Sequence, residues 1–329
     1  MFGTQPYDQE SFDRVGRDYG FGMVYHKSHL NADSAVLAEG SEAVCIFVND
    51  EADAAAIARL ADLGVRLIAL RCAGFNNVDL RAAARFAIPV VRVPAYSPHA
   101  VAEHAVALLL TLNRKIHRAY WRTRDGNFSL HGLLGYDLWG KTAGIVGTGR
   151  IARCLIRILL GFGMRVLAYD PCPDAALAAS EGFDYVPLDE LYARSDVISL
   201  HCPLNDSTRY MIGDVAIAQM KPGVVLINTW RGQLIHTEAL IDGLKEGRIG
   251  AAGLDVYEEE AAYFYEDTSD RIMDDDVLAR LLSFHNVIVT SHQGFFTREA
   301  LDNIARTTLD NLREFAEGRP LTNRVLLEA

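Results

Sequence analysis

Short apolar runs alternate with segments of helical spacing along most of this chain, and this pattern predicts a parallel α/β architecture. In the first hundred residues, three strand-like runs are separated by two helix-like segments. Each strand-like run leads into polar or glycine-bearing residues, as parallel strands do where they meet loops. The expected strands cover residues 43–48, 67–70 and 90–93, and the expected helices cover residues 52–63 and 78–87.

The same alternation resumes after one long helical segment. Pro98 suits a first helical turn and an apolar stripe follows it, so we expect a single helix over residues 98–124. Six strand-like runs come next, which is typical of a doubly wound dinucleotide-binding domain. The expected strands cover residues 142–147, 166–169, 197–200, 224–228, 250–256 and 287–290, and the later helices cover 188–194, 214–220, 237–246, 276–282 and 299–317.

Two domains are expected, with one inserted into the other. A single core seldom grows much past ~250–300 residues, and the chain has 329. The last helix most simply packs back on the first domain. The sequence therefore predicts a substrate domain of residues 1–98 and 295–329, and an NAD-binding domain of residues 99–294. Residues 1–4 are too few for a full first strand, which suggests a weakened sheet edge or a late start.

The clearest motif is a glycine turn between a predicted strand and a predicted helix. Gly147 permits the tight turn, and Gly149 has no side chain to keep a pyrophosphate off the backbone. The helix that follows directs its first N–H groups and its positive dipole end at that anion. Asp170 lies 21 residues beyond Gly149, at the end of the next strand, where a carboxylate accepts the ribose hydroxyls. A carboxylate repels a 2′-phosphate, so this motif predicts NAD rather than NADP.

Several ionisable side chains fall where predicted strands end. Ligands of open parallel sheets bind beyond the carboxyl ends of the strands, so these residues should converge on one crevice. They are Asp170, His201, Arg231, Asp255, Glu260 and His292.

Hydride transfer to a 2-oxo acid requires three protein groups, and the predicted crevice holds candidates for each. A cation must bind the substrate carboxylate and polarise its carbonyl, and Arg231 is the available bidentate donor. A histidine such as His292 can carry the proton near neutral pH. A carboxylate beside it, such as Glu260, favours the protonated imidazole.

Alternatives remain open for each of these groups. Periodicity does not choose Glu260 over Glu258 or Glu259, and Arg231 could instead form a structural ion pair with Asp255. His201 is a second candidate for the acid, although its place at a strand end suggests that it lines the cofactor.

Composition narrows the class of partner. The formal net charge of −11 argues against nucleic acid, and no run near ~20 apolar residues predicts a membrane span. Five scattered cysteines without a C-x-x-C pair are typical of reduced thiols in a cytoplasm. His99 and Glu103 share a predicted helix face beside His104, but no third ligand is apparent, so no metal is expected.

These residues resemble those of the D-isomer-specific 2-hydroxyacid dehydrogenase family, and most closely its bacterial fermentative D-lactate branch. The resemblance runs from Tyr7 to Asn311, and an acidic aromatic insert at residues 263–267 is similar to one in the lactate branch. The matching segments are RCAGFNNVDL (71–80), VPAYSPHAVAEHA (93–105), LNRKIHRAY (112–120), GTGRI (147–151), AYDP (168–171), DVISLHCPL (196–204), INTWRG (227–232), LDVYEEE (254–260) and SHQGFFT (291–297).

The resemblance implies a Rossmann NAD domain inserted into a flavodoxin-like substrate domain, and reduction of pyruvate to D-lactate with NADH. It implies a cytoplasmic homodimer or homotetramer, assembled through the NAD domain. The implied catalytic residues are Arg231, Glu260 and His292; the implied NAD-binding residues are Gly147, Gly149, Arg150, Ile151, Asp170, Cys202, Pro203, Thr208, Thr229, Trp230 and Asp255; the implied substrate-binding residues are Ala73, Gly74, Tyr96, Arg231 and Phe295.

Two departures from the family pattern bear on function. Ala152 stands at the third glycine position of the turn, which is a small change in packing. Trp230 stands where a small residue, often Ser, usually precedes the catalytic arginine, so the substrate range is open. Another 2-oxo acid such as phenylpyruvate, hydroxypyruvate or oxaloacetate is one alternative. A non-catalytic NAD-sensing scaffold similar to the C-terminal-binding-protein corepressors is the other.

Overall fold

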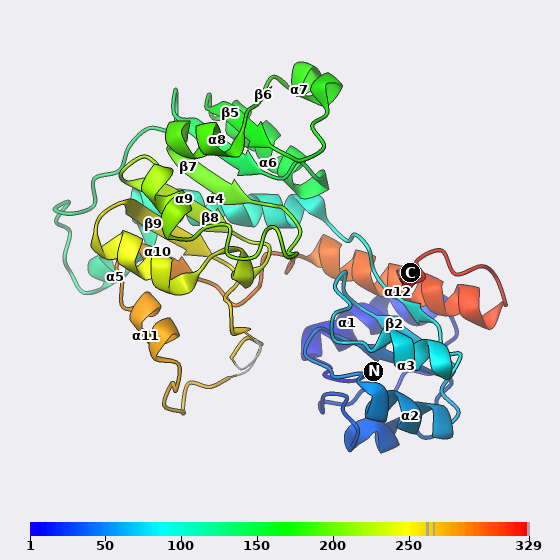
Figure 1. Ribbon diagram of the computed structural model, residues 1–329. Helices are drawn as coiled ribbons and strands as arrows, with labels where there is room; N and C mark the ends of the chain where they lie inside the picture. Colours follow the sequence, from blue (N-terminus) through cyan, green and yellow to red (C-terminus); the bar gives the residue numbers. More distant parts are fainter. Residues whose placement is uncertain (261–262, 266, 328–329) are drawn as a thin grey trace. The chain divides into compact units, whose positions relative to one another are not determined.

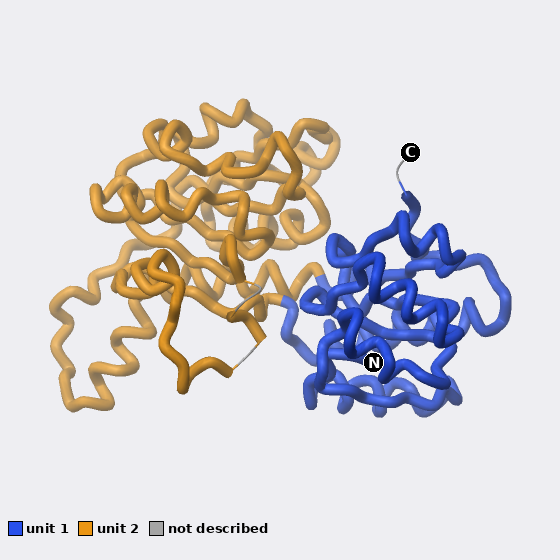
Figure 2. Tube along the Cα trace, turned by 60° about the horizontal axis from the view of Figure 1, so that its bottom comes forward, with its two compact units in different colours: residues 1–97, 295–329 blue, residues 98–294 orange. Residues whose placement is uncertain are grey.

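The chain folds into two compact units, each with its own parallel sheet. The computed structural model describes residues 1–260, 263–265 and 267–327. Unit 1 comprises Met1–Ser97 and Phe295–Ala329, and unit 2 comprises Pro98–Gly294 (Figure 2). Unit 2 is thus a continuous segment inserted between the two segments of unit 1.

Unit 1 is a three-stranded parallel sheet with helices on both faces. The strand order is β1-β2-β3. Successive residues of β2 alternate between the faces: Ile68 and Leu70 join the core with α2 and α3, whereas Leu67 and Ala69 pack towards α12. The elements are α1 (Pro6–Val15), β1 (Ala43–Ile46), α2 (Ala54–Asp62), β2 (Leu67–Leu70), α3 (Leu80–Arg85), β3 (Val90–Val91) and α12 (Arg298–Ala316), with short 3-10 turns at Gly16–Asp18 and Ser34–Ala38.

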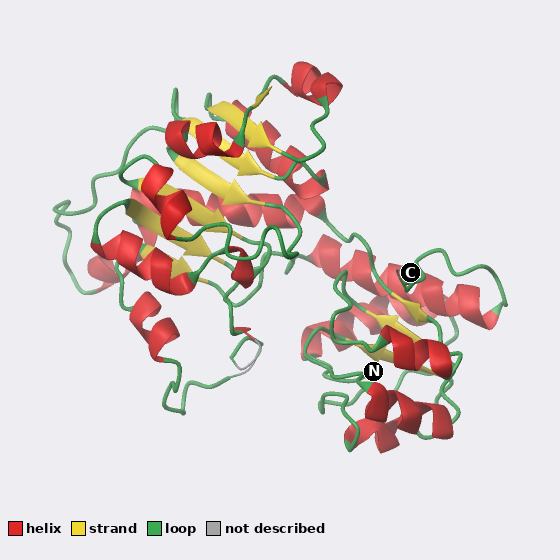
Figure 3. Ribbon diagram, in the orientation of Figure 1, coloured by secondary structure: helices red, strands yellow, loops and turns green. Residues whose placement is uncertain are grey.

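Unit 2 is a seven-stranded parallel sheet in the order β10-β9-β8-β7-β4-β5-β6. The chain order reverses between β4 and β7, and helices cover both faces (Figures 1 and 3). The strands are β4 (Thr142–Val146), β5 (Arg165–Tyr169), β6 (Asp184–Tyr185), β7 (Val197–Leu200), β8 (Val224–Asn228), β9 (Ile249–Leu254) and β10 (Val287–Val289). The helices are α4 (Pro98–Arg114), α5 (Ile116–Arg124), α6 (Arg150–Gly161), α7 (Ala175–Glu181), α8 (Leu188–Arg194), α9 (Asp214–Gln219), α10 (Thr237–Lys245) and α11 (Asp276–Leu282), with a 3-10 turn at Gly232–Leu234.

The period-2 pattern of the strands separates the core of unit 2 into two layers. Ile145 of β4 packs with α4 and α6, whereas the next residue, Val146, packs with α8, α9 and α10. Because both faces are covered, the central strands of unit 2 are predominantly apolar, as the sequence pattern indicated. The expected α/β fold class, with a parallel sheet in each domain and a Rossmann NAD domain, is confirmed; the strand order reverses in unit 2, whereas the three described strands of unit 1 follow the order β1-β2-β3.

The expectation of one helix over residues 98–124 is wrong. Lys115 adopts left-handed dihedrals, with φ 50° and ψ 39°, and divides the segment into α4 and α5. The Lys115 ammonium donates to the carbonyl of Leu134 at 2.6 Å, and the Asn113 amide donates to the carbonyl of Tyr136 at 2.8 Å. The returning loop therefore fixes the break, and this contact is remote in sequence.

The prediction of six strands in unit 2 missed one strand: β6 pairs with β5 at the edge of the sheet. β6 has only two residues, Asp184 and Tyr185, and so carries no apolar run that a sequence pattern could reveal. Helices α1 and α7 were also not predicted. No helix in the described ranges has the length and apolar character needed to cross a bilayer.

Candidate active site

Three neighbouring strands of unit 2 end in register at the same edge of the sheet. Asn228 of β8 is aligned with Leu254 of β9, which is aligned with Val289 of β10. Arg231 and His292 each lie three residues beyond these ends. Since adjacent strands are ~4.8 Å apart, the two loops leave the sheet about 10 Å from each other. Two long side chains can span that distance and hold a small molecule between them.

His292 and Glu260 form a hydrogen-bonded pair. Nδ1 of His292 lies 2.8 Å from Oε1 of Glu260, and both side chains are largely buried. The second carboxylate oxygen, Oε2, accepts from the backbone N–H of Tyr257 at 3.0 Å. The carboxylate thus fixes the orientation of the ring and places an acceptor beside Nδ1. Nδ1 is committed to Glu260, so Nε2 is the nitrogen left to exchange a proton with a substrate.

The structure distinguishes the three adjacent glutamates. Glu260 contacts His292, whereas Oε2 of Glu258 accepts from the backbone N–H of Thr237 at 2.8 Å. Glu259 is exposed. Periodicity could not make this choice, because all three are acids in one polar run, and the glutamate that contacts His292 is the one that the family resemblance implied.

The backbone of His292 is held in an uncommon conformation. Its φ is +53°, a region that non-glycine residues enter at a cost, often at functional sites. Its N–H donates to the carbonyl of Asp255 at 2.7 Å, and the Tyr265 hydroxyl donates to the His292 carbonyl at 3.2 Å. Sequence reasoning missed Tyr265 as a residue in its own right, although it lies in the aromatic insert. Glu266, also part of that expected insert, lies outside the described residues.

Asp255 is a buried anchor for the loop that carries His292. Its Oδ1 accepts from the Thr290 hydroxyl at 2.6 Å and from the Gln293 N–H at 2.9 Å, and its Oδ2 accepts from the Gly294 N–H at 2.7 Å. His104 of α4 lies 3.2 Å from Oδ1 through its Nε2. The expected contact of Asp255 with NAD stays a prediction. Within the described residues, no group of three potential metal ligands is found.

Arg231 has no acidic partner among the described residues, so the alternative of an ion pair with Asp255 is not formed. Asn228 fixes the backbone around it: Oδ1 accepts from the Trp230 N–H at 3.1 Å, and Nδ2 donates to the Arg231 carbonyl at 2.8 Å. A Cβ on Gly232 would overlap the Tyr257 carbonyl, so the loop after β8 packs directly on the loop after β9. Asn228 is a second residue that sequence reasoning missed.

The two glycines of the turn have different surroundings. Gly147 has φ +90°, and a Cβ there would lie 2.7 Å from the carbonyl oxygen of His201. A Cβ on Gly149 would meet nothing within 4 Å, and Gly149 caps α6 without any side-chain hydrogen bond. Helix α6 then begins at Arg150 and Ile151, with no side chain bonded to its N-terminus by the cap. This arrangement fits the pyrophosphate of NAD.

Asp170 is a charged group tied to that turn. Oδ2 accepts from the N–H and the hydroxyl of Thr148 at 2.8 and 2.9 Å, and Oδ1 accepts from the Cys172 N–H at 2.9 Å. Burial opposes ionisation, but these hydrogen bonds outweigh it and hold the pKa of the carboxyl below its ordinary value. An ionised Asp170 can accept from ribose hydroxyls.

His201 does not fit the alternative role of acid. It is buried, its Nε2 lies 2.8 Å from the Ser199 hydroxyl, and burial lowers its pKa to about 4. The side chain is therefore neutral near pH 7. The next predicted cofactor residues follow it: Cys202 is buried, and the Thr208 hydroxyl donates to the Pro203 carbonyl at 2.6 Å. The buried hydroxyl of Thr229 has no protein partner in the described structure.

The predicted substrate residues of unit 1 lie around the end of β2 and at the junction with α12. The carbonyl of Ala73 accepts from the Arg92 guanidinium at 2.8 Å, and the carbonyl of Gly74 accepts from the Cys72 thiol at 3.2 Å. The rings of Tyr96 and Phe295 are 6.1 Å apart in an edge-to-face arrangement. Their roles stay predictions.

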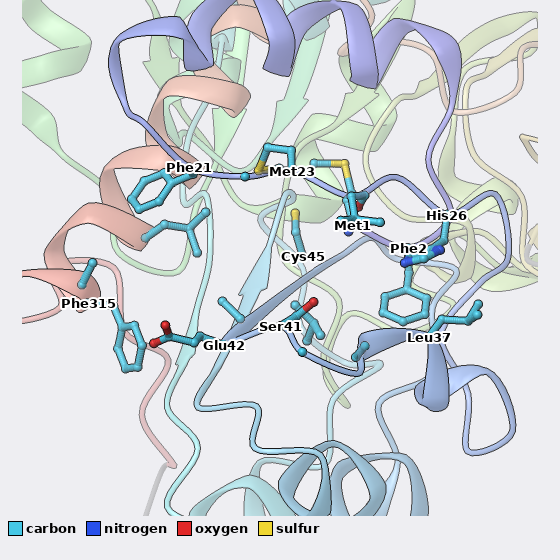
Figure 4. Close-up of a pocket in the computed structure, with 18 residues that line it drawn as sticks. Met1, Phe2, Phe21, Met23, His26, Leu37, Ser41, Glu42, Cys45 and Phe315 are labelled. Carbon is cyan, nitrogen blue, oxygen red and sulfur yellow. Dashed lines mark hydrogen bonds between the residues drawn. The ribbon is translucent and has the colours of Figure 1, made fainter.

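A separate hollow of about 350 Å³ lies in unit 1 along β1. Its lining includes Phe21, Met23, Glu42, Cys45 and Phe315 (Figure 4). None of the predicted catalytic, cofactor or substrate residues lines it. It is therefore not the candidate active site.

Comparisons with known proteins identify the class. The sequence model of the D-isomer specific 2-hydroxyacid dehydrogenase NAD-binding domain matches residues 106–294. The chain is 50% identical to a D-lactate dehydrogenase of Escherichia coli strain K12 over 326 residues, which are 99% of each chain. Together with the glycine turn, these matches define an NAD-dependent dehydrogenase. The chain belongs to the D-isomer specific 2-hydroxyacid dehydrogenase family.

Solved structures agree with this assignment. The apo structure of D-lactate dehydrogenase from Escherichia coli superposes with a TM-score of 0.90 at 48% identity, covering 99% of this chain and 98% of that one. A pyruvate reductase of Chlamydomonas reinhardtii gives a TM-score of 0.94 at 47% identity, covering 98% and 97%. A D-lactate dehydrogenase with NAD+ from Lactobacillus jensenii gives 0.85 at 31% identity, covering 99% and 98%. The expected cofactor, NAD, is confirmed at the level of the family.

Proposed function

We propose that this protein reduces pyruvate to D-lactate with NADH. The observation that carries the proposal is the 2.8 Å pair of His292 and Glu260 at the sheet edge that also bears Arg231, whose guanidinium has no acidic partner in the described ranges. Relatives named D-lactate dehydrogenase and pyruvate reductase support the choice of substrate.

Three side chains carry the chemistry of the protein in this proposal. Arg231 binds the pyruvate carboxylate and polarises the ketone. The cofactor supplies a hydride to the ketone carbon. Protonated His292 donates its Nε2 proton to the ketone oxygen, so one hydride and one proton convert the ketone to an alcohol. Glu260 holds the imidazole in place and stabilises its positive charge before the transfer.

NAD would be held mostly by unit 2. The open N-terminus of α6, at Arg150 and Ile151, would receive the pyrophosphate, and Asp170 would accept the ribose hydroxyls. The carboxylate of Asp170 disfavours a 2′-phosphate, which supports NAD over NADP. The remaining proposed contacts are Gly147, Gly149, Cys202, Pro203, Thr208, Thr229, Trp230 and Asp255.

The substrate domain is proposed to be residues 1–98 with 295–329, and the NAD-binding domain residues 99–294. In this assignment, Tyr96 and the backbone at Ala73 and Gly74 contact the substrate carboxylate, and Phe295 contacts the methyl group. The edge-to-face packing of Phe295 and Tyr96 supports this assignment, because it places an apolar ring and a phenol side by side, next to the proposed positions of the methyl group and the carboxylate.

The test is stereospecific turnover. The purified protein should oxidise NADH when pyruvate is added and should produce D-lactate, measured with a chiral assay. Arg231→Ala should lower the rate by ~10²–10³, as loss of one such electrostatic contact does. Arg165→Ala, which removes an exposed arginine at the start of β5, is the matched control. A normal rate in Arg231→Ala would contradict the assignment.

A different 2-oxo acid is the second candidate, and the unusual Trp230 favours testing it. A panel of kcat/KM values for pyruvate, phenylpyruvate, hydroxypyruvate and oxaloacetate would rank the substrates. Binding of NADH without turnover of any of them would instead support a non-catalytic scaffold.

We also propose that the protein is a homo-oligomer assembled through the NAD domain. The segment that follows α4 exposes large apolar side chains that a monomer would leave in water. They are Trp121 at 65% exposure, Phe128 at 76%, Leu130 at 82%, Leu134 at 88% and Trp139 at 79%. A second copy of the chain is the partner that the family resemblance implies.

Sedimentation velocity tests this assembly. Leu134→Glu should shift the protein towards a monomer, whereas Val215→Glu, at an equally exposed apolar site on α9, should not. A monomeric wild type would contradict the proposal. We place the protein in the cytoplasm, because its five cysteines are scattered along the sequence without a C-x-x-C pair, which is typical of proteins in a reducing compartment.

A further inference from the structure

The residue that precedes Arg231 is in direct contact with its guanidinium. Cζ of Arg231 lies over the ring of Trp230, 5.3 Å from the centroid, and Nη1 of Arg231 donates to the Trp230 carbonyl at 2.6 Å. Both side chains are half-buried. The indole packs against the core layer formed with α8, α9 and α10, and the backbone N–H of Trp230 donates to Oδ1 of Asn228, so both the ring and its backbone are held.

This contact can reduce the entropy that the Arg231 side chain loses when it binds a substrate. A free arginine side chain has many rotamers, and holding it in one of them for substrate costs entropy. Elsewhere in proteins a carboxylate often holds such a guanidinium, but no described acid pairs with Arg231, and an acid there would compete with the substrate. An aromatic face attracts a cation without occupying its N–H edge. The indole of Trp230 can therefore restrain Arg231 while leaving available to a carboxylate the N–H groups that do not donate to the Trp230 carbonyl.

We propose that Trp230 is a positioning residue for the substrate carboxylate, acting by holding the guanidinium of Arg231 in its binding orientation. The proposal rests on the proposed role of Arg231 as the carboxylate ligand. It does not depend on which 2-oxo acid is the physiological substrate, since every such acid carries the same carboxylate.

A graded series of variants separates positioning from packing. Trp230→Phe keeps an aromatic face, Trp230→Leu keeps apolar bulk without that face, and Trp230→Ser restores a small side chain. Positioning predicts that the KM for pyruvate rises little in the Phe variant and about three- to thirtyfold in the Leu and Ser variants, with a smaller change in kcat. Packing alone predicts instead that Leu behaves like the wild type.

Calorimetric titration of oxamate, a pyruvate mimic, into each variant loaded with NADH gives a readout that does not need turnover. The dissociation constant of oxamate should follow the same order as KM, and it should rise by a larger factor than the dissociation constant of NADH, which Trp230 also contacts in the proposed function. Retention of wild-type oxamate affinity by the Leu variant would overturn the proposal. An equal weakening of NADH and oxamate would also overturn it, because Trp230 would then support the cofactor.

The two proposals fail in different ways. If wild type binds oxamate and reduces no pyruvate, the proposed function fails, and the oxamate series still decides the role of Trp230. If wild type reduces pyruvate and all three variants match its KM, only the positioning role fails. Melting temperatures of the four proteins identify any variant that is not folded, and the Phe and Leu pair then carries the comparison.

Discussion

The glycine turn and the catalytic loops lie on the same sheet, yet they are built in opposite ways. The turn is one continuous stretch, and backbone N–H groups with missing side chains give it its properties. The catalytic loops follow three different strands, β8, β9 and β10, and the contact between His292 and Glu260 joins two of them across 32 residues. A site made of backbone is encoded locally, whereas a site made of side chains depends on how loops fold onto one another.

The two regions also contain histidines in different surroundings. The carbonyl of His201 lies against Gly147, and burial keeps the His201 ring neutral. The ring of His292 is instead hydrogen-bonded to the carboxylate of Glu260. The same residue type is therefore a structural part of one region and a candidate acid in the other, and its surroundings alone decide between them.

The largest effect is expected from a substitution in the catalytic loops, which should abolish most of the turnover and leave cofactor binding at the glycine turn unchanged. His292→Asn should lower the rate of pyruvate reduction by ~10²–10⁴, because the proton donor is lost. Asparagine tolerates the left-handed backbone at this position, so folding should be preserved. Steady-state kinetics and NADH titration measure this, and NADH affinity should match wild type. A rate within tenfold of wild type would remove His292 from the mechanism.

Glu260→Gln tests the same loops by removing only the charge beside the imidazole. The amide can still accept a hydrogen bond, but it places no negative charge next to the proposed proton donor, so pyruvate reduction should slow by about tenfold or more. Steady-state rates of the variant and the wild type give the comparison, with Glu259→Gln, at an exposed neighbour, as the control. An unchanged rate would show that Glu260 does not act through His292.

The next largest effects are expected from alanine substitutions in the turn, where Gly147 and Gly149 should affect different properties. Gly147→Ala forces a Cβ against the His201 carbonyl at a φ of +90°, and should destabilise the fold by about 2–4 kcal/mol. Gly149→Ala meets no protein atom, so it should melt like wild type and yet bind NADH at least about tenfold more weakly. Thermal unfolding and NADH titration distinguish these outcomes. Equal melting temperatures for the two variants would contradict the packing argument.

A stability effect that depends on pH should arise at His201. Its pKa is about 4 in the folded protein and near 6.5 unfolded, so the unfolded chain binds the extra proton between these values. The contribution of the neutral His201 ring to the free energy of unfolding is therefore complete above pH 6.5, and it is lost as the pH falls towards 4. From pH 7 to pH 4, wild type should lose up to about 3 kcal/mol more than His201→Gln. Urea unfolding at several pH values measures this difference, and parallel curves would disprove it.

The smallest effect tests the strained backbone of His292. Tyr265→Phe removes the hydroxyl that donates to the His292 carbonyl, a loss of about 1 kcal/mol. We expect a fewfold decrease in kcat and no change in NADH affinity. Tyr263→Phe, in the same segment, is the control. An equal decrease in both variants would assign the effect to the segment as a whole.

The sequence by itself determined the features that need only local information. Strand and helix patterns repeat within a few residues, and the turn between Gly147 and Asp170 lies within a single βαβ unit, so the fold class and the cofactor could be predicted. The ends of β8, β9 and β10 could be predicted to within two residues, and with them the edge at which Arg231 and His292 would lie.

Only the tertiary structure decided which side chains meet. It selected Glu260 from three adjacent acids, broke the expected long helix at Lys115 through a contact with Leu134, and placed Tyr265 on the His292 carbonyl. Each of these contacts joins residues that are 19 or more positions apart, with geometry set by the conformation of a loop. Loop conformations of this kind have no repeating pattern of polar and apolar residues, because they are stabilised by distant partners rather than by neighbours in sequence.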